Sequence, residues 1–210
     1  EEEAIPLKKS IPMLFKNKYW VILILFNLIT QITNSIAATS GTYYCKWIFG
    51  NDNLVALAGA LGFFATLVGF VVSKPIIAKL GVRKTIDFGV LGAAFTALIR
   101  CIIPTNFKVY IAVSVIGSFV QIPLMCLYGV LLAMVIDYNE YTYYNKMVGV
   151  SSGAIGIGTK IGSGVGSVIL TACLALGAYN PDLEVATTSM RYAIYAFSNY
   201  LPMIINLGLF

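Results

Sequence analysis

A single lysine stands alone in an apolar stretch that is long enough to cross a membrane. Lys160 lies near the middle of the run 148–170, which contains no other charged residue. On lenient insertion scales a cation at this depth costs roughly 2.5–3.5 kcal/mol, so it requires a polar cavity or an acidic partner. Such a lysine can balance the charge of nearby acids in a polar cavity, which is chemistry used in transport. The alternative is a purely structural ion pair.

Two carboxylates follow at the end of another apolar segment. Asp137 and Glu140 are three residues apart, so they share one face if the preceding helix continues through them. Carboxylates at the C-terminus of a helix oppose its dipole, so a basic partner is expected, either Lys146 or a residue from another part of the protein. We interpret the pair as a cytoplasmic gate, with a solvated loop and acid–base catalysis as the alternatives.

Small residues surround Lys160 on two faces of the same predicted helix. Gly158, Gly162 and Gly166 recur every four residues, which gives a small face that lets another backbone approach closely. The face of Lys160 is different, and at helical spacing it includes Gly153, Gly156, Ser163, Gly164 and Ser167. We expect the first face to pack against a helix and the second to border a polar space.

The composition predicts that these residues lie in membrane-spanning helices. Of the 210 residues, 59% are hydrophobic and 11% are charged, whereas soluble domains are about 45–50% apolar and 25% charged. Most apolar segments have the roughly 20 residues that a helix needs to cross a bilayer. The six segments are 19–41, 53–73, 86–103, 109–136, 149–176 and 190–210. The strict alternation of a membrane β-barrel is missing, so we predict an all-α integral membrane protein, with a cytoplasmic lead-in over 1–18 and a six-helix transmembrane bundle over 19–210.

Basic residues are distributed unequally between the two sides of this predicted bundle. Nine of them lie before the first segment, between the second and third, or after the fourth, against four on the other side. The nine are Lys8, Lys9, Lys16, Lys18, Lys74, Lys79, Arg83, Lys84 and Lys146, and the four are Lys46, Arg100, Lys108 and Arg191. The positive-inside rule then places the N-terminus in the cytoplasm of a multi-pass plasma-membrane protein. Because topology accounts for the net charge of +5, no nucleic-acid partner is predicted.

The residue types argue against two common kinds of site. The sequence contains no histidine, and its four cysteines have no CxxC spacing, so neither a zinc site nor a histidine-based triad is expected. No nucleophile paired with a base occurs at membrane depth, so we do not predict an enzyme. No metal site and no cofactor are expected.

Amide and hydroxyl side chains indicate which helices face a cavity. In the first segment Asn27, Gln31 and Asn34 align at helical spacing. In the fourth segment Gln121 and Tyr128 share one face. Polar stripes of this kind are unfavourable against lipid, so these five residues are predicted to line a substrate cavity, with a helix interface as the alternative for the first segment.

The same residues carry a resemblance to a known family. The pattern consists of Asp137-Tyr138-x-Glu140, Gly149, Ser152, Lys160-x-Gly162 and Leu176-Gly177-Ala178-Tyr179-Asn180, and it extends to Thr42-Tyr43-Tyr44, Gly81-Val82-Arg83-Lys84 and Leu201-Pro202. It resembles the carboxy-terminal half of the glycoside/pentoside/hexuronide cation symporters, within the major facilitator superfamily. The chain departs from the family at Met134, where another acid is common, and at Tyr143-Tyr144-Asn145-Lys146, which stands in place of a Thr-Gly followed by basic residues.

The resemblance implies that the six helices are the second half of a twelve-helix transporter, in a bacterial inner membrane. The substrate would be a sugar or glycoside, and the coupling ion, Na⁺ or H⁺, would be held mainly by acids of the amino-terminal six-helix half. Lys160 would couple cation and sugar. Two alternatives remain open: a lipid or drug carrier on the same fold, and a non-transporting membrane helix-bundle interaction module.

The charge asymmetry leads to a prediction about topology. In intact cells that express the full-length protein without its native cysteines, a membrane-impermeant thiol reagent is expected to label Lys46→Cys and not Arg83→Cys. Permeabilising the membrane should expose Arg83→Cys, because the side with more basic residues stays in the cytoplasm. The reverse labelling pattern would overturn the assigned orientation.

Overall fold

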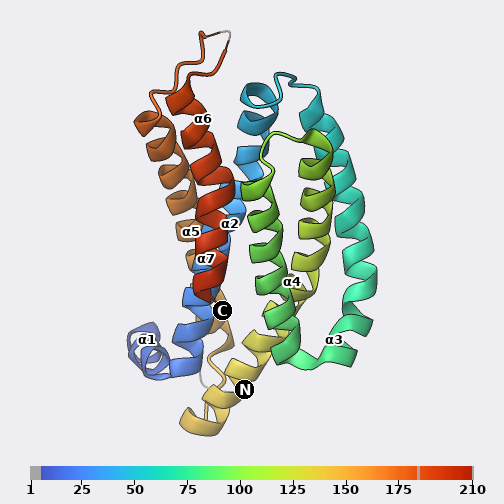
Figure 1. The fold of residues 1–210 in the computed structure, drawn as a ribbon. Helices are drawn as coiled ribbons and strands as arrows, with labels where there is room; N and C mark the ends of the chain where they lie inside the picture. The colour runs from blue at the N-terminus through green and yellow to red at the C-terminus, as the bar shows by residue number, and fades with distance from the viewer. Residues whose placement is uncertain (1–5, 184, 210) are drawn as a thin grey trace.

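All regular elements in the described part of the chain are helices (Figure 1). The structure is a computed structural model that describes residues 6–183 and 185–209. The elements are α1 (Leu7–Lys16), α2 (Lys18–Trp47), α3 (Leu54–Ile102), α4 (Phe107–Tyr143), α5 (Val148–Leu176), α6 (Thr188–Tyr195), the π-helical turn η1 (Ala196–Tyr200) and α7 (Leu201–Leu209). The prediction of an all-α fold is confirmed.

The six apolar segments recognised in the sequence correspond to these helices. α2, α4 and α5 cover the first, fourth and fifth segments, while α3 covers the second and third in one run. Each of these four helices is long and apolar enough to span a membrane. The sixth segment is formed by α6, η1 and α7 in immediate succession. The protein is therefore a multi-pass membrane protein.

One residue separates the two arms of α3. Gly81 has φ 76° and ψ 172°, and the helix continues past Pro75 until it reaches this glycine. Glycine adopts positive φ without the steric cost that a Cβ atom would add. The arms 54–80 and 82–102 therefore form an antiparallel hairpin with almost no loop (Figure 1).

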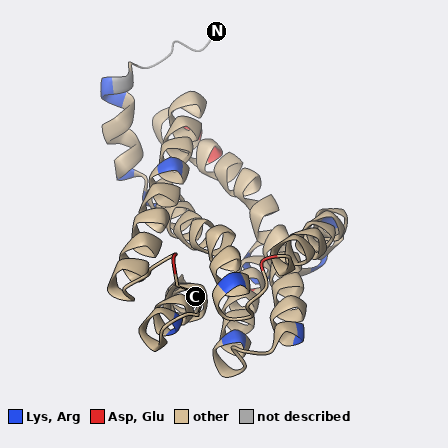
Figure 2. Ribbon diagram, turned by 90° about the horizontal axis from the view of Figure 1, so that it is seen from above, with Lys and Arg blue, Asp and Glu red and all other residues tan. Residues whose placement is uncertain are grey.

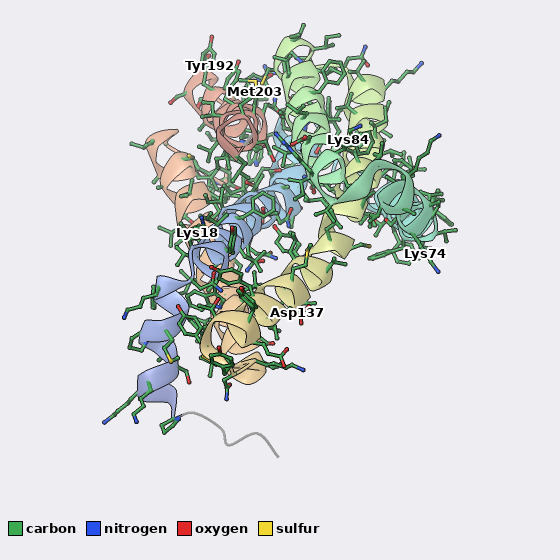
Figure 3. All side chains as sticks on the ribbon, turned by 90° about the horizontal axis from the view of Figure 1, so that it is seen from below. Lys18, Lys74, Lys84, Asp137, Tyr192 and Met203 are labelled. Carbon is green, nitrogen blue, oxygen red and sulfur yellow. The ribbon has the colours of Figure 1, made fainter. Side chains whose placement is uncertain are left out.

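The antiparallel order of the helices collects basic residues at one end of the bundle. The lower end in Figure 1 contains α1, the start of α2, the turn at Gly81 and the end of α4. The view from below shows Lys18 at the start of α2, with Lys74 and Lys84 on the two arms of α3 (Figure 3). All nine basic residues counted above lie on these elements or in the connection after α4. The unequal charge of the sequence is thus a difference between the two ends of the fold.

Glycines let the arms of α3 pack closely on α4. A Cβ atom added to Gly69 would lie 2.9 Å from the Ile122 side chain, and one added to Gly89 would lie 2.8 Å from Leu124. Both distances are shorter than ordinary Cβ contacts, so a side chain could not be added without displacing α4. Lipid tails are as apolar as the side chains, so helix association in a membrane depends on close van der Waals packing of this kind, together with interhelical hydrogen bonds.

The glycine face of α5 packs on α2. Gly158, Gly162 and Gly166 are buried, and a Cβ atom on Gly162 would lie 2.7 Å from the Leu28 carbonyl oxygen. One on Gly166 would lie at the same distance from the Ile32 carbonyl oxygen. Backbone oxygens cannot rotate away as side chains do, so this interface requires glycine.

This interface leads to a prediction about folding. Gly162→Leu is expected to lower the folded yield of the full-length protein, because bulk forced into a tight interface costs about 1–3 kcal/mol. Size-exclusion chromatography after detergent extraction measures the yield. Ala172→Leu adds bulk at an exposed position of the same helix and should leave the yield nearly unchanged. Equal yields for the two variants would contradict the packing role.

Candidate functional site

A polar cleft lies among α2, α3, α4 and α7. It brings together Asn34 of α2 with Gln121 and Tyr128 of α4, three of the five residues that the sequence analysis assigned to a cavity, and it adds Thr33 of α2 and Asn206 of α7. The cleft itself is narrow and has about 10 Å³ of free space. It adjoins a cavity of about 250 Å³ that shares Thr33, Gln121 and Asn206 with it. Amide and hydroxyl groups from three helices therefore converge inside the bundle.

Two predicted lining residues of α2 lie elsewhere. Asn27 is buried, and its Nδ2 atom donates to the carbonyl oxygen of Ile155 at 3.3 Å and to Oγ1 of Thr159 at 3.1 Å. Gln31 lies beside Gly162, with its Cβ atom 2.9 Å from where a Cβ of that glycine would be. Both residues therefore belong to the interface with α5, because their positions on α2 point toward that helix and not toward the cleft.

The side of α5 that carries Lys160 is exposed. Lys160, Gly153, Gly156 and Gly164 are all exposed, and a Cβ atom added to any of these glycines would have no neighbour within 4 Å. Within the described residues no acidic group lies within ion-pair distance of the lysine. An apolar strip that includes Ile157 lies next to this face. The small polar strip with its lysine is therefore a separate surface, distinct from the glycine face that packs on α2.

The two acids at the lower end lie at the surface. Asp137 and Glu140 are exposed, and the Nζ atom of Lys146 lies 3.6 Å from Oε1 of Glu140. The two side chains of this pair are 44% and 47% exposed, and ion pairs this exposed contribute little to stability, typically less than about 1 kcal/mol. The basic partner expected from the sequence is present for Glu140, and Figure 3 shows Asp137 on the lower part of α4.

A buried hydrogen-bond network at the lower end of the bundle was not predicted from the sequence. The Nδ2 atom of Asn17 donates to Oδ1 of Asn139 at 2.7 Å, and Nδ2 of Asn139 donates to Oγ of Ser151 at 3.4 Å. All three residues are buried. The Asn17 side chain also accepts from the backbone N–H groups that begin α2. This network ties the lower ends of α2, α4 and α5 together.

A second network joins α2, α3 and the last segment near the upper end. The Nδ2 atom of Asn199 donates to the Tyr44 hydroxyl at 3.1 Å, and the Tyr44 hydroxyl donates to the carbonyl oxygen of Pro104 at 2.7 Å. Nη2 of Arg100 donates to the carbonyl oxygen of Ser198 at 3.1 Å. Asn199 and Ser198 belong to η1, and π-helical turns often mark functional positions. Sequence reasoning gave neither Arg100 nor Asn199 a site role, although Asn199 and Asn206 are seven residues apart and lie on one helical face.

Another groove has a different character. It measures about 540 Å³ and is lined almost entirely by apolar residues of α2, α3, α4 and α7, including Phe26, Leu131 and Met134. A polyhydroxylated ligand would find few hydrogen-bond partners on such walls. The polar cleft above it is therefore the better candidate site.

Comparison with known proteins adds an independent line of evidence. Residues 1–210 match the family model described as "MFS/sugar transport protein". The chain is 19% identical over 203 residues to the putative glycoside/cation symporter YagG of Escherichia coli, covering 96% of this chain and 44% of that protein. It is 28% identical over 185 residues to the isoprimeverose transporter of Lactiplantibacillus pentosus, covering 85% of this chain and 37% of that protein. The chain thus spans less than half the length of these two relatives.

The contrast between the two asparagines of α2 leads to a prediction about stability. Asn27→Ala removes two hydrogen bonds to α5 and is expected to destabilise the full-length protein by about 1 kcal/mol. Asn34→Ala removes a side chain that lines the cleft and should leave the unfolding midpoint nearly unchanged. Thermal unfolding of the two purified variants provides the comparison. Equal losses would mean that Asn34 is structural as well.

Proposed function

The chain belongs to the MFS/sugar transport protein family, and we propose that it is the carboxy-terminal half of a cation-coupled sugar or glycoside symporter. Its partner would be an amino-terminal six-helix half, and alternating access would rock the two halves around a site near the middle of the bilayer. The coupling ion would be Na⁺ or H⁺. The membrane would be a bacterial inner membrane, with the lower end of the bundle in the cytoplasm.

The observation that carries this proposal is the exposed lysine at membrane depth. Lys160 has no acidic partner among the described residues, and an uncompensated cation in a bilayer is unfavourable. The open glycines around it leave room for a second bundle to approach. Acids of an amino-terminal half would supply the missing counter-charge, and the short span of the chain relative to its relatives is consistent with such a half.

The polar cleft supplies groups suited to sugar hydroxyls. Asn34 and Gln121 offer amides that both donate and accept, and Tyr128 adds a hydroxyl. In this proposal these three residues bind the substrate from the carboxy-terminal side. Asn27 and Gln31 act indirectly, because they hold α2 against α5 and thereby fix the distance between the cleft and Lys160.

The lower end would then act as a gate. The exposed acids Asp137 and Glu140 can form ion pairs with basic residues of the other half when the cytoplasmic side closes, and they can release them when it opens. The buried Asn17–Asn139–Ser151 network keeps the lower ends of α2, α4 and α5 moving as one body. The exposed Glu140–Lys146 pair is weak enough to exchange partners during this movement.

Transport by the full-length protein in sealed vesicles tests the proposal. With an imposed Na⁺ or H⁺ gradient the wild type is expected to accumulate a labelled sugar or glycoside, whereas Lys160→Ala should reach the membrane and lose uphill accumulation. Lys160→Arg should recover little of the uphill accumulation, because a planar guanidinium does not replace a compact ammonium in a tight site.

A matched control separates the role of Lys160 from a general loss of positive charge. Lys46→Ala removes an exposed lysine near the upper end of α2 and should leave accumulation intact. Uphill uptake by Lys160→Ala at the wild-type level would refute the coupling role. Failure of the wild type to exchange any sugar across the membrane would favour the interaction-module or lipid-carrier alternatives.

A further inference from the structure

A second basic residue lies among the helices of the bundle, near the upper end of α3. Arg100, two residues before the end of the second arm of α3, lines the cavity of about 250 Å³ described above. Residues of four helices line this cavity, and no aspartate or glutamate is among them. An arginine keeps its positive charge in proteins. The cavity therefore contains a cation without a carboxylate.

The contacts of the guanidinium leave part of its charge without a partner. Nη2 donates to the Ser198 carbonyl oxygen at 3.1 Å, and the group lies over the Tyr110 ring at 5.3 Å from its centre. The Nε atom is buried and has no hydrogen-bond partner among the described residues. The only ion pair in the described part of the chain is the one between Lys146 and Glu140. Arg100 is only partly exposed, and a charge that loses hydration is normally paired, because that loss must be offset.

The other polar groups of the cavity show where donors remain available. The hydroxyls of Thr33, Thr96 and Ser118 donate to backbone carbonyl oxygens of their own helices. The Ser114 hydroxyl is buried beside Tyr110, and, as for the Arg100 Nε atom, no hydrogen bond of standard geometry takes its proton among the described residues. Two donors therefore line the same cavity, and one of them is charged. Since a water occupies about 30 Å³ of liquid volume, the cavity has room for a small ion and several waters.

We propose that this cavity binds a small monovalent anion, held by the guanidinium of Arg100 and the hydroxyl of Ser114. The anion is either inorganic, such as chloride, or the carboxylate of a small solute. Charge-assisted hydrogen bonds from an arginine suit both kinds of anion. The site is separate from the exposed face of Lys160, and it does not depend on sugar transport.

Thermal unfolding of the purified full-length protein tests the site. The unfolding midpoint is followed while a bulky sulfonate salt is replaced by chloride in one series and by acetate in another, at constant ionic strength. A ligand that binds only the folded state raises the midpoint in a saturable way, and a rise of roughly 2–4 °C is expected for a protein of this size class. A response to chloride identifies an inorganic ion, and a response to acetate alone identifies a carboxylate.

Variants of the cavity show whether the response comes from this site. Arg100→Gln should abolish the saturable rise, whereas Lys108→Gln, which removes an exposed lysine at the same end, should keep it. Ser114→Ala keeps the charge and should raise the half-saturating concentration by about 2–10-fold, which is the loss of one hydrogen bond. This second variant decides the matter if Arg100→Gln does not fold. The proposal is overturned if neither anion produces a saturable rise, or if Ser114→Ala and Lys108→Gln respond alike.

Discussion

The lack of hydrogen-bond partners in hydrocarbon is the constraint on which this structure depends. Every polar side chain placed between the helices must be satisfied by the protein itself. Thr30, Thr66 and Ser73 donate to the carbonyl oxygen one turn earlier in their own helix. Asn27 and Ser35 instead bond across to α5. Lys160 on the outside of α5 and Arg100 among the helices have no acidic partner within ion-pair distance among the described residues, and the proposals above rest on them.

Much of the fold follows from the sequence because bilayer thickness sets the length of every spanning helix. The six apolar segments gave the number and order of the helices, and the four-residue glycine repeat of α5 identified the face that now lies against α2. Both signals lie within one helix, so they can be recognised in the sequence without knowledge of the tertiary structure. The sequence does not show that the second and third segments form one run of helix, α3. Only the conformation of Gly81 separates its two arms.

The site was harder to predict because helical spacing gives a direction around one helix and does not say which neighbour lies there. Asn27 and Asn34 are on one stripe, yet the first bonds to α5 and the second lines the cleft. Asn139 lies between two surface acids in the sequence and is completely buried, because Asn17 from a distant part of the chain covers it. Charged positions are sparse over the ribbon as a whole (Figure 2), and the buried polar residues of the described chain are serines, threonines and asparagines, whose partners only the tertiary structure defines.

The hairpin at Gly81 also determines where this chain can change in length. A connection of one residue has no slack, so an added or deleted residue would rotate the second arm of α3 by about 100° and move its glycines away from α4. The connection between α5 and α6 is longer, and its described residues from Asn180 to Leu183 are mainly exposed, as is usual where insertions are tolerated. Reporter tags and natural length variation should therefore be confined to that upper connection, while the lower turn of α3 stays fixed in length.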